Sequence, residues 1–140
     1  MTQMDAFVKE LRVRFNEVDH AGIVFYPRFF DWFHMAFEDF FEAHTEAPYH
    51  VWTSERRVGW PAVHIETDLR SPVRYGDAFR VAMTFPKVGR TSFVARYDVF
   101  VGERHCARAE ITVVTTNLDT LTPLELPATV RAALERFPAS

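Results

Sequence analysis

The sequence contains little cysteine and little glycine, and it has no long hydrophobic run. The single cysteine, Cys106, excludes an internal disulfide and suits a reducing compartment, and its alternating surroundings favour a packed or surface thiol over a nucleophile. Gly59 and Gly76 belong to no glycine-rich loop that would cradle a phosphate. No apolar run is long enough to span a bilayer, and no basic-then-apolar leader follows the polar start. We therefore expect a soluble, cytoplasmic protein without a signal peptide or a membrane partner.

The chain also lacks an excess of positive charge. The net charge is −3, so the chain lacks the general basic surface that nucleic-acid binding requires. Arginine greatly outnumbers lysine, and any contact with an anion would therefore be local. The 140 residues fit a single domain, residues 1–140, with one hydrophobic core. The 14 phenylalanines predict an aromatic core, or an aromatic interface between subunits, and so favour self-association.

Periodic hydrophobicity predicts one strand, one long helix, four further strands and a short closing helix. Residues 10–16 alternate as a half-buried strand, and residues 28–44 are apolar around most of a helix. A short helix is possible at residues 51–56. Strands are predicted at residues 62–71, 79–85, 93–101 and 105–116, and the last helix at residues 130–137. Because short turns join consecutive antiparallel strands, we predict an α+β fold with a curved five-stranded antiparallel sheet wrapped around a long central helix. The open sheet edges would invite a second copy.

Chemistry is predicted where the first strand gives way to the central helix. Residues 19–27 read Asp-His-Ala-Gly-Ile-Val-Phe-Tyr-Pro, so Asp19 precedes a glycine turn and a helix start. Unpaired N–H groups at a helix start can polarise a carbonyl, and Asp19 could attack that carbonyl or activate a water. Gly22 would let the backbone approach the reacting group. The alternative is that Asp19 only caps the turn or the helix, and residue types alone leave both interpretations open.

The same segment resembles the signature of the hotdog-fold thioesterases related to 4-hydroxybenzoyl-CoA thioesterase. Val58-Gly59-Trp60-Pro61 and Arg90-Thr91-Ser92-Phe93 are also similar to that family. The resemblance implies hydrolysis of an acyl-CoA thioester, with coenzyme A as part of the substrate and neither metal nor cofactor. It implies that Asp19 is the nucleophile or general base and that the Tyr26 backbone N–H binds the thioester carbonyl. It further implies a homodimer paired edge to edge, usually assembled into a homotetramer, with the site at the subunit interface.

The resemblance also bears on the acyl group. Tyr26 favours an aromatic acyl group, whereas His34 occupies the helix position where relatives that act on 4-hydroxybenzoyl-CoA carry an aspartate. A benzoyl group, or an aryl group with a differently placed polar substituent, therefore fits as well. Trp32 and Tyr49 align with aromatic positions near the acyl pocket, although Trp32 also fits a purely structural place in the core. Arg90, just after a glycine turn, is a candidate for a CoA phosphate or an ordinary surface arginine.

Other readings stay open beside this one. His34, Glu38 and Glu42 recur along one helix face, but three such residues on one helix rarely enclose a metal, so a polar stripe is the expected role and no metal site is predicted. His20 is a loop histidine that would touch the reacting group or simply be exposed. An alternative enzyme is a thioesterase for short aliphatic acyl-CoA or acyl carrier protein. A non-catalytic hotdog module that binds an acyl ligand is the alternative outside enzymes.

Overall fold

The computed structural model describes residues 6–139 as three α-helices, a short 3-10 helix and eight strands. The prediction about a leader concerns residues 1–5 and lies outside the described residues. The elements are β1 Phe7–Arg12, the 3-10 helix η2 Phe15–Glu17, α1 Arg28–His44, α2 Tyr49–Ser54, β2 Val58–Gly59, β3 Ala62–Leu69, β4 Ala78–Val88, β5 Ser92–Val101, β6 Arg104–Val114, β7 Thr116–Asn117, β8 Thr122–Pro123 and α3 Ala128–Glu135.

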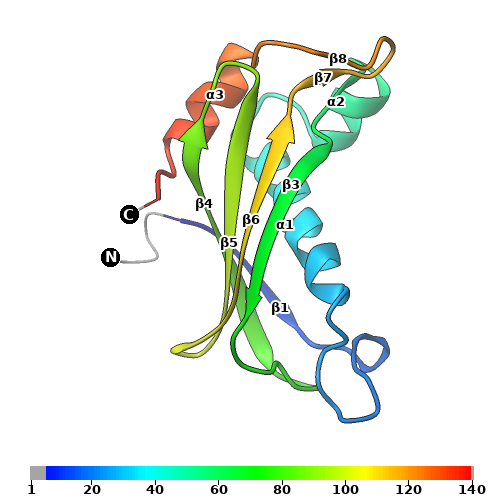
Figure 1. Cartoon of the computed structure of the whole chain (residues 1–140), viewed down its shortest axis with the longest axis vertical. Helices are drawn as coiled ribbons and strands as arrows, with labels where there is room; N and C mark the ends of the chain where they lie inside the picture. Colours follow the sequence, from blue (N-terminus) through cyan, green and yellow to red (C-terminus); the bar gives the residue numbers. More distant parts are fainter. Residues whose placement is uncertain (1–5, 140) are drawn as a thin grey trace.

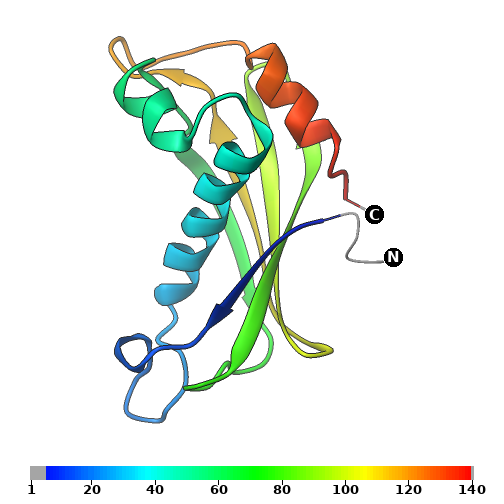
Figure 2. The ribbon, with the colours of Figure 1, turned by 180° about the vertical axis from the view of Figure 1, so that it is seen from behind.

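The five longer strands form one antiparallel sheet with the order β1-β4-β5-β6-β3. Helix α1 lies against one face of this sheet, and α3 lies at the end of the sheet where β4 finishes (Figures 1 and 2). The predicted α+β architecture with a five-stranded antiparallel sheet is therefore confirmed. Its main helix has 17 residues and the bounds that the sequence predicted.

Aromatic side chains explain why α1 packs on the sheet. The helix buries seven side chains, and its polar residues recur on the opposite side. Phe33 stacks on Tyr97 of β5, and Phe40 packs on Phe85 of β4. The buried residues of α1 are Phe29, Trp32, Phe33, Ala36, Phe37, Phe40 and Phe41. An amphipathic helix with so wide an apolar surface gains most of its stability from such packing.

The first strand ends earlier than its alternating pattern predicts. β1 stops at Arg12, and the predicted continuation to residue 16 is wrong because the chain turns into η2. The turn closes when the Glu17 N–H donates to the Arg14 carbonyl, while the Arg14 N–H donates to Glu17 Oε1 at 2.7 Å. Phe15, an apolar position of the predicted half-buried strand, is 78% exposed.

The sheet order also corrects the expectation that each consecutive pair of strands lies side by side. β3 pairs with β6 and forms the edge opposite β1, so β3 and β4 are not neighbours. Their connection, residues 70–77, crosses the end of the sheet, where the N–H groups of Arg70 and Ser71 donate to the Cys106 carbonyl. As a result, β3 exposes one backbone edge and the apolar side chains of Val63, Ile65 and Leu69.

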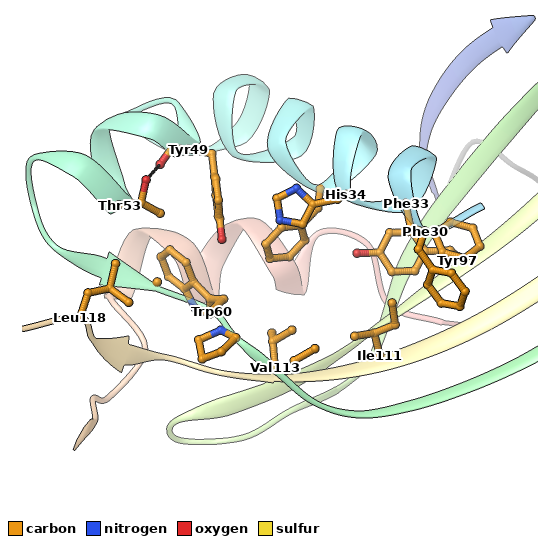
Figure 3. Close-up of a pocket in the computed structure, with 14 residues that line it drawn as sticks. Phe30, Phe33, His34, Tyr49, Thr53, Trp60, Tyr97, Ile111, Val113 and Leu118 are labelled. Carbon is orange, nitrogen blue, oxygen red and sulfur yellow. Dashed lines mark hydrogen bonds between the residues drawn. The ribbon is translucent and has the colours of Figure 1, made fainter. Parts of the chain in front are cut away.

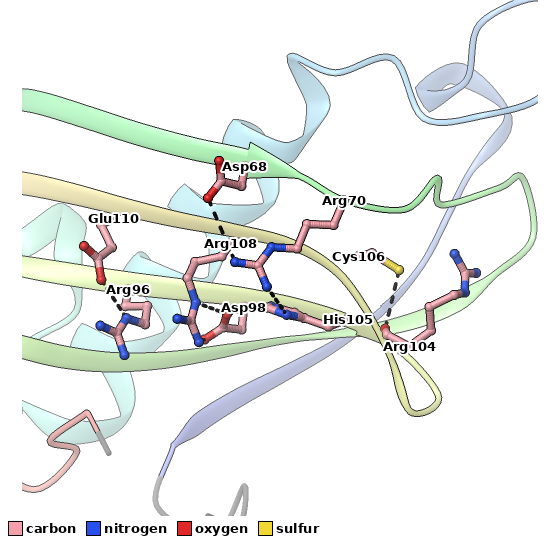
Figure 4. A network of polar contacts seen from close by, with 9 residues as sticks. All are labelled: Asp68, Arg70, Arg96, Asp98, Arg104, His105, Cys106, Arg108 and Glu110. Atoms are coloured by element: carbon pink, nitrogen blue, oxygen red, sulfur yellow. Dashed lines mark hydrogen bonds and ion pairs between the residues drawn. The ribbon is translucent and has the colours of Figure 1, made fainter.

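Two further features were not predicted. β2, β7 and β8 form a small second sheet. The face of the main sheet that points away from α1 carries a polar network centred on Asp98, whose Oδ1 lies 2.7 Å from both His105 Nε2 and Arg108 Nε (Figure 4). Within residues 6–139, no helix is long and apolar enough to cross a membrane.

Candidate active site

The segment that begins at Asp19 is held by short backbone hydrogen bonds. The Asp19 N–H donates to the Ile23 carbonyl at 2.9 Å, and the Gly22 N–H donates to the Asp19 carbonyl at 3.0 Å. Gly22 has φ +78°, a conformation that side chains with a Cβ rarely adopt. A Cβ at Gly22 would meet no atom within 4 Å, so within one chain this glycine supplies a backbone conformation and not a close approach.

Asp19 and Tyr26 lie on the same pocket, at the end of the sheet where α1 begins. The pocket has a volume of about 450 Å³ and is closed on its other side by the connection between β3 and β4. The Ala21 N–H donates to Asp19 Oδ1 at 2.8 Å, so the predicted turn-capping role is real for one carboxylate oxygen. No described residue donates to the second oxygen. The pocket is lined by Asp19, Ile23, Val24, Phe25, Tyr26, Phe29, Leu69, Arg70, Ser71, Pro72 and Val73.

A free backbone N–H group stands at Tyr26. Helix α1 begins two residues later, and the N–H groups of Arg28, Phe29 and Phe30 donate to the carbonyls of residues 25, 26 and 27. Among residues 6–139, none accepts a hydrogen bond from the Tyr26 N–H. The first turn of the helix is thus satisfied internally, and the Tyr26 N–H, the donor that the resemblance implied, is left available to a ligand in this pocket.

Glu17 connects this pocket to the core, and no sequence pattern singled it out beyond its being an acidic residue near a turn. Its Oε2 accepts a hydrogen bond from the Trp32 indole Nε1–H at 2.9 Å, and its backbone carbonyl accepts one from the Phe25 N–H at 2.9 Å. Glu17 therefore connects the segment before Asp19 to α1 through Trp32. It also connects that segment to Phe25, the residue that precedes Tyr26. It acts on the position of the candidate groups, not on the pocket itself.

Arg70 is the second residue of this site that sequence patterns did not single out. It follows β3 directly and lines the Asp19 pocket. Arg104, from the start of β6, donates to Ser71 Oγ and to the Pro72 carbonyl, both at 2.6 Å, and so brings a second guanidinium to the same wall. The residues come together because the connection between β3 and β4 crosses the sheet end, which only the strand order reveals.

A second pocket lies further along α1, between this helix and the sheet. Its volume is about 390 Å³, and most of its lining is apolar or aromatic. His34 and Tyr49, both predicted to contact substrate, point into it (Figure 3). The His34 imidazole Nδ1 lies 2.8 Å from Glu38 Oε2, and its ring meets the Tyr49 ring edge to face. The lining residues are Phe30, Phe33, His34, Phe37, Tyr49, Thr53, Gly59, Trp60, Pro61, Ala62, Tyr97, Ile111, Val113 and Leu118.

Two phenols in the second pocket are held in the protonated form. Burial raises the pKa of Tyr49 to about 12, with a further increase from the nearby Glu38 carboxylate. Burial also raises the pKa of Tyr97 above its ordinary value. Both hydroxyl groups consequently keep their protons at neutral pH and can donate hydrogen bonds as well as accept them.

The remaining predicted residues lie outside these two pockets. Trp32 is 1% exposed and packs on Phe79 and Phe29 in the core, in agreement with the structural alternative weighed for it. Arg90 lies in the turn between β4 and β5, at the end of the sheet opposite the Asp19 segment (Figure 1). His20 is exposed and lines only a shallow depression beside Asp19. Within the described chain, no three His, Cys, Asp or Glu residues are grouped as metal ligands.

Comparison with known proteins identifies the family. The profile of the thioesterase-like superfamily matches residues 13–134, which is most of the chain. The chain belongs to this superfamily. This thioesterase-like protein is 27% identical over 129 residues to a 1,4-dihydroxy-2-naphthoyl-CoA hydrolase of Prochlorococcus marinus (strain MIT 9303), a match that covers 88% of the chain and 85% of the relative.

Solved structures agree with this assignment. The thioesterase-like protein superimposes on the gentisyl-coenzyme A thioesterase BH1999 with a TM-score of 0.80 and 25% identity, covering 89% of this chain and 98% of that one. It superimposes on Slr0204, a 1,4-dihydroxy-2-naphthoyl-CoA thioesterase from Synechocystis, with a TM-score of 0.83 and 24% identity, covering 92% and 95% of the two chains. The predicted family and the predicted class of enzyme, a thioester hydrolase, are confirmed.

Proposed function

We propose that this protein is an acyl-CoA thioesterase in which Asp19 and the Tyr26 backbone N–H carry out the reaction. One observation carries the proposal: a carboxylate with one unbonded oxygen and a backbone N–H without a partner line the same pocket. A cytoplasmic location, which the single buried Cys106 suits, belongs to the same proposal.

The proposed reaction needs only water and these two groups of the chain. The thioester carbonyl oxygen accepts a hydrogen bond from the Tyr26 N–H, which stabilises the negative charge that develops on that oxygen. Asp19 either attacks the carbonyl carbon or removes a proton from the water that does so. In both routes the carbon–sulfur bond breaks and coenzyme A leaves as its thiol. Water supplies the oxygen of the released carboxylic acid and the two protons that balance the products.

The acyl group is proposed to be aromatic, of the benzoyl type. The second pocket offers ring faces and edges from Phe33, Phe37, Tyr49 and Trp60, and a pocket of about 390 Å³ is of the size that small ligands occupy. Relatives and structural neighbours named for naphthoyl-CoA and gentisyl-CoA support the same class. His34 and Tyr49 would contact the acyl group, and Gly22 would hold the turn beside the reacting carbonyl.

Two copies are proposed to pair through β3 and to assemble further into a homotetramer. β3 is an edge strand with an open row of backbone groups and three exposed apolar side chains, features that favour pairing with another strand. The Asp19 pocket includes Leu69 at the end of β3, so a partner across this strand would border the pocket. Arg90, which is remote from Asp19 of its own chain, would then meet a CoA phosphate bound to another subunit.

A panel of CoA thioesters tests the proposal on the wild-type protein. Release of the CoA thiol is measured with benzoyl-CoA, acetyl-CoA and butyryl-CoA, and binding is measured in parallel by calorimetry. We expect kcat/KM for benzoyl-CoA to exceed the aliphatic values by about 10-fold or more, because an aromatic ring fills the pocket better. A preference for the aliphatic thioesters would instead favour the short-chain enzyme. Binding of every thioester without turnover would overturn the enzymatic role and favour an acyl-binding module.

A further inference from the structure

The hydroxyl group of Tyr97 faces the second pocket without a hydrogen-bond partner among residues 6–139, although the residue as a whole is buried. Tyr97 lies on β5 and is 4% exposed. Among residues 6–139, none donates a hydrogen bond to its hydroxyl or accepts one from it. Figure 3 shows the hydroxyl pointing into the second pocket, toward the space that the Tyr49 hydroxyl enters from the other side. The hydroxyl oxygen itself still meets the cavity, since the only fully buried side-chain nitrogen or oxygen atom without a partner in the described residues is Thr67 Oγ1. A ligand that fills the cavity must therefore bond to this hydroxyl or bury it unpaired, which is costly.

The surrounding structure prevents Tyr97 from turning away. Its backbone is fixed between two strands, because Tyr97 pairs with Met83 of β4 and with Ala109 of β6. Its ring stacks on Phe33 of α1, with the ring centroids 4.8 Å apart and the planes 27° from parallel. The direction of the hydroxyl is therefore set by the sheet and the helix, and it is available to a ligand without rearrangement.

The second pocket contains few polar side chains, and all of them are uncharged hydrogen-bonding groups or an imidazole. Besides the Tyr97 hydroxyl, the side chains that offer hydrogen-bonding atoms are His34, Tyr49, Thr53 and Trp60, and none of the lining residues is a carboxylate. The Trp60 Nε1–H already donates to Thr115 Oγ1 at 3.0 Å. The Thr53 hydroxyl already donates to the Tyr49 backbone carbonyl, and His34 is bonded to Glu38. Two phenols, Tyr97 and Tyr49, are thus left to bond to a ligand, and each can donate and accept. The Tyr49 oxygen already interacts with the Trp60 backbone N–H, so Tyr97 is the phenol without a partner in the described residues.

We propose that Tyr97 is a specificity-determining residue that forms a hydrogen bond with a hydroxyl group on the ring of an aromatic acyl substrate. The inference rests on the proposed function, since it concerns the acyl group of the same thioester. In this proposal the aromatic lining of the second pocket holds the ring of the acyl group. The stacking of Tyr97 on Phe33 then places the Tyr97 hydroxyl at the edge of that substrate ring. An unsubstituted ring leaves the Tyr97 hydroxyl buried and unpaired, so the pocket discriminates against it.

Tyr97→Phe tests this role, because it removes only the hydroxyl and keeps the stacked ring. The values of kcat/KM are measured for benzoyl-CoA and for its 2-, 3- and 4-hydroxy derivatives. We expect the wild type to prefer at least one hydroxy derivative, and Tyr97→Phe to reduce that preference about 3- to 10-fold, the worth of one hydrogen bond. The value for benzoyl-CoA should stay constant or rise. Tyr75→Phe is the control, since Tyr75 is exposed and lines neither pocket, and it should leave the preference unchanged.

Two results would overturn the role of Tyr97. A hydroxyl preference that is the same in the wild type and Tyr97→Phe would mean that another group bonds to the substituent. Equal losses for benzoyl-CoA and its hydroxy derivatives would mean that Tyr97 acts only in packing. Calorimetry with free benzoate and hydroxybenzoates separates this test from the proposed function. If no thioester is hydrolysed, the proposed function is wrong. Binding of hydroxybenzoate in preference to benzoate would still support the role of Tyr97 if Tyr97→Phe abolishes that preference. The same preference left intact in Tyr97→Phe would refute the role.

Discussion

Replacing Glu17 with alanine removes a carboxylate that joins the turn before Asp19 to the central helix. In the wild type, Glu17 Oε2 accepts the Trp32 Nε1–H at 2.9 Å and Oε1 accepts the Arg14 N–H at 2.7 Å. Trp32 is almost fully buried, so the alanine variant leaves its indole N–H without a partner. Arg14 is exposed, and water can replace the bond to its N–H.

The expected loss of stability follows from the difference between the buried Trp32 donor and the exposed Arg14 donor. A hydrogen bond to a charged group contributes about 1.5–3 kcal/mol, and the buried indole donor accounts for most of that loss here. We therefore expect Glu17→Ala to lower the free energy of unfolding by about 2 kcal/mol. For a chain of this size that corresponds to a decrease in Tm of roughly 4–8 °C.

A double-mutant cycle with Trp32→Phe isolates the bond itself. Urea unfolding followed by circular dichroism gives the four free energies, at one protein concentration because association would otherwise shift them. The coupling energy between Glu17 and Trp32 should be about 1–2 kcal/mol. A coupling energy within about 0.3 kcal/mol of zero would refute the argument, because independent sites are additive to that extent.

Three further results are expected. Because burial raises the pKa of Tyr49 to about 12 and also raises that of Tyr97, the folded chain holds both phenolic protons more tightly than the unfolded chain. The free energy of unfolding should therefore decrease as pH rises above about 10, by up to about 1.4 kcal/mol per pH unit for each tyrosine. Urea unfolding at pH 9 and pH 11 measures this, and Tyr97→Phe should show a shallower decrease. Ile65→Arg places a charge on the β3 edge and should convert the proposed dimer to a monomer. Light scattering measures the molar mass, and an unchanged mass would exclude pairing through β3. Gly22→Ala should lower the free energy of unfolding by about 1 kcal/mol because Gly22 has a positive φ. The control Gly102→Ala, at φ +59°, should lower it by a similar amount. Only Gly22→Ala should also reduce thioester turnover.

Local patterns predicted the elements well where packing follows the sequence directly. The predicted bounds of α1 were correct because its aromatic residues recur at helical spacing and bury as a group. β1 was predicted at residues 10–16 and lies at Phe7–Arg12, because Val13 and Phe15 continue the alternation beyond the last paired residue, Arg12. The chain leaves the sheet there for a reason that alternation does not record, the bond between the Arg14 N–H and the Glu17 carboxylate.

Non-local arrangement accounts for what the sequence left unpredicted. Short connections suggested that β3 and β4 are neighbours, whereas β3 crosses to the far edge and brings Arg70 to the Asp19 pocket. Tyr97 reads as one more apolar position of an alternating strand. Its unpaired hydroxyl becomes visible only when α1, β2 and β6 enclose a cavity in front of it. Conversely, Asp19 and Tyr26 could be proposed together from the sequence because one continuous segment, which resembles the thioesterase signature, carries both of them.

Turnover of an aromatic CoA thioester by Asp19→Asn measures the central claim most directly. The matched control is Asp31→Asn, since Asp31 is an exposed carboxylate of the first turn of α1 that lines neither pocket. We predict that Asp19→Asn lowers kcat for benzoyl-CoA by about 10²-fold or more while acyl-CoA binding persists. Asp31→Asn should stay within about 2-fold of the wild type, as expected for a surface substitution. Wild-type turnover by Asp19→Asn would contradict the assignment of Asp19 as the reacting carboxylate.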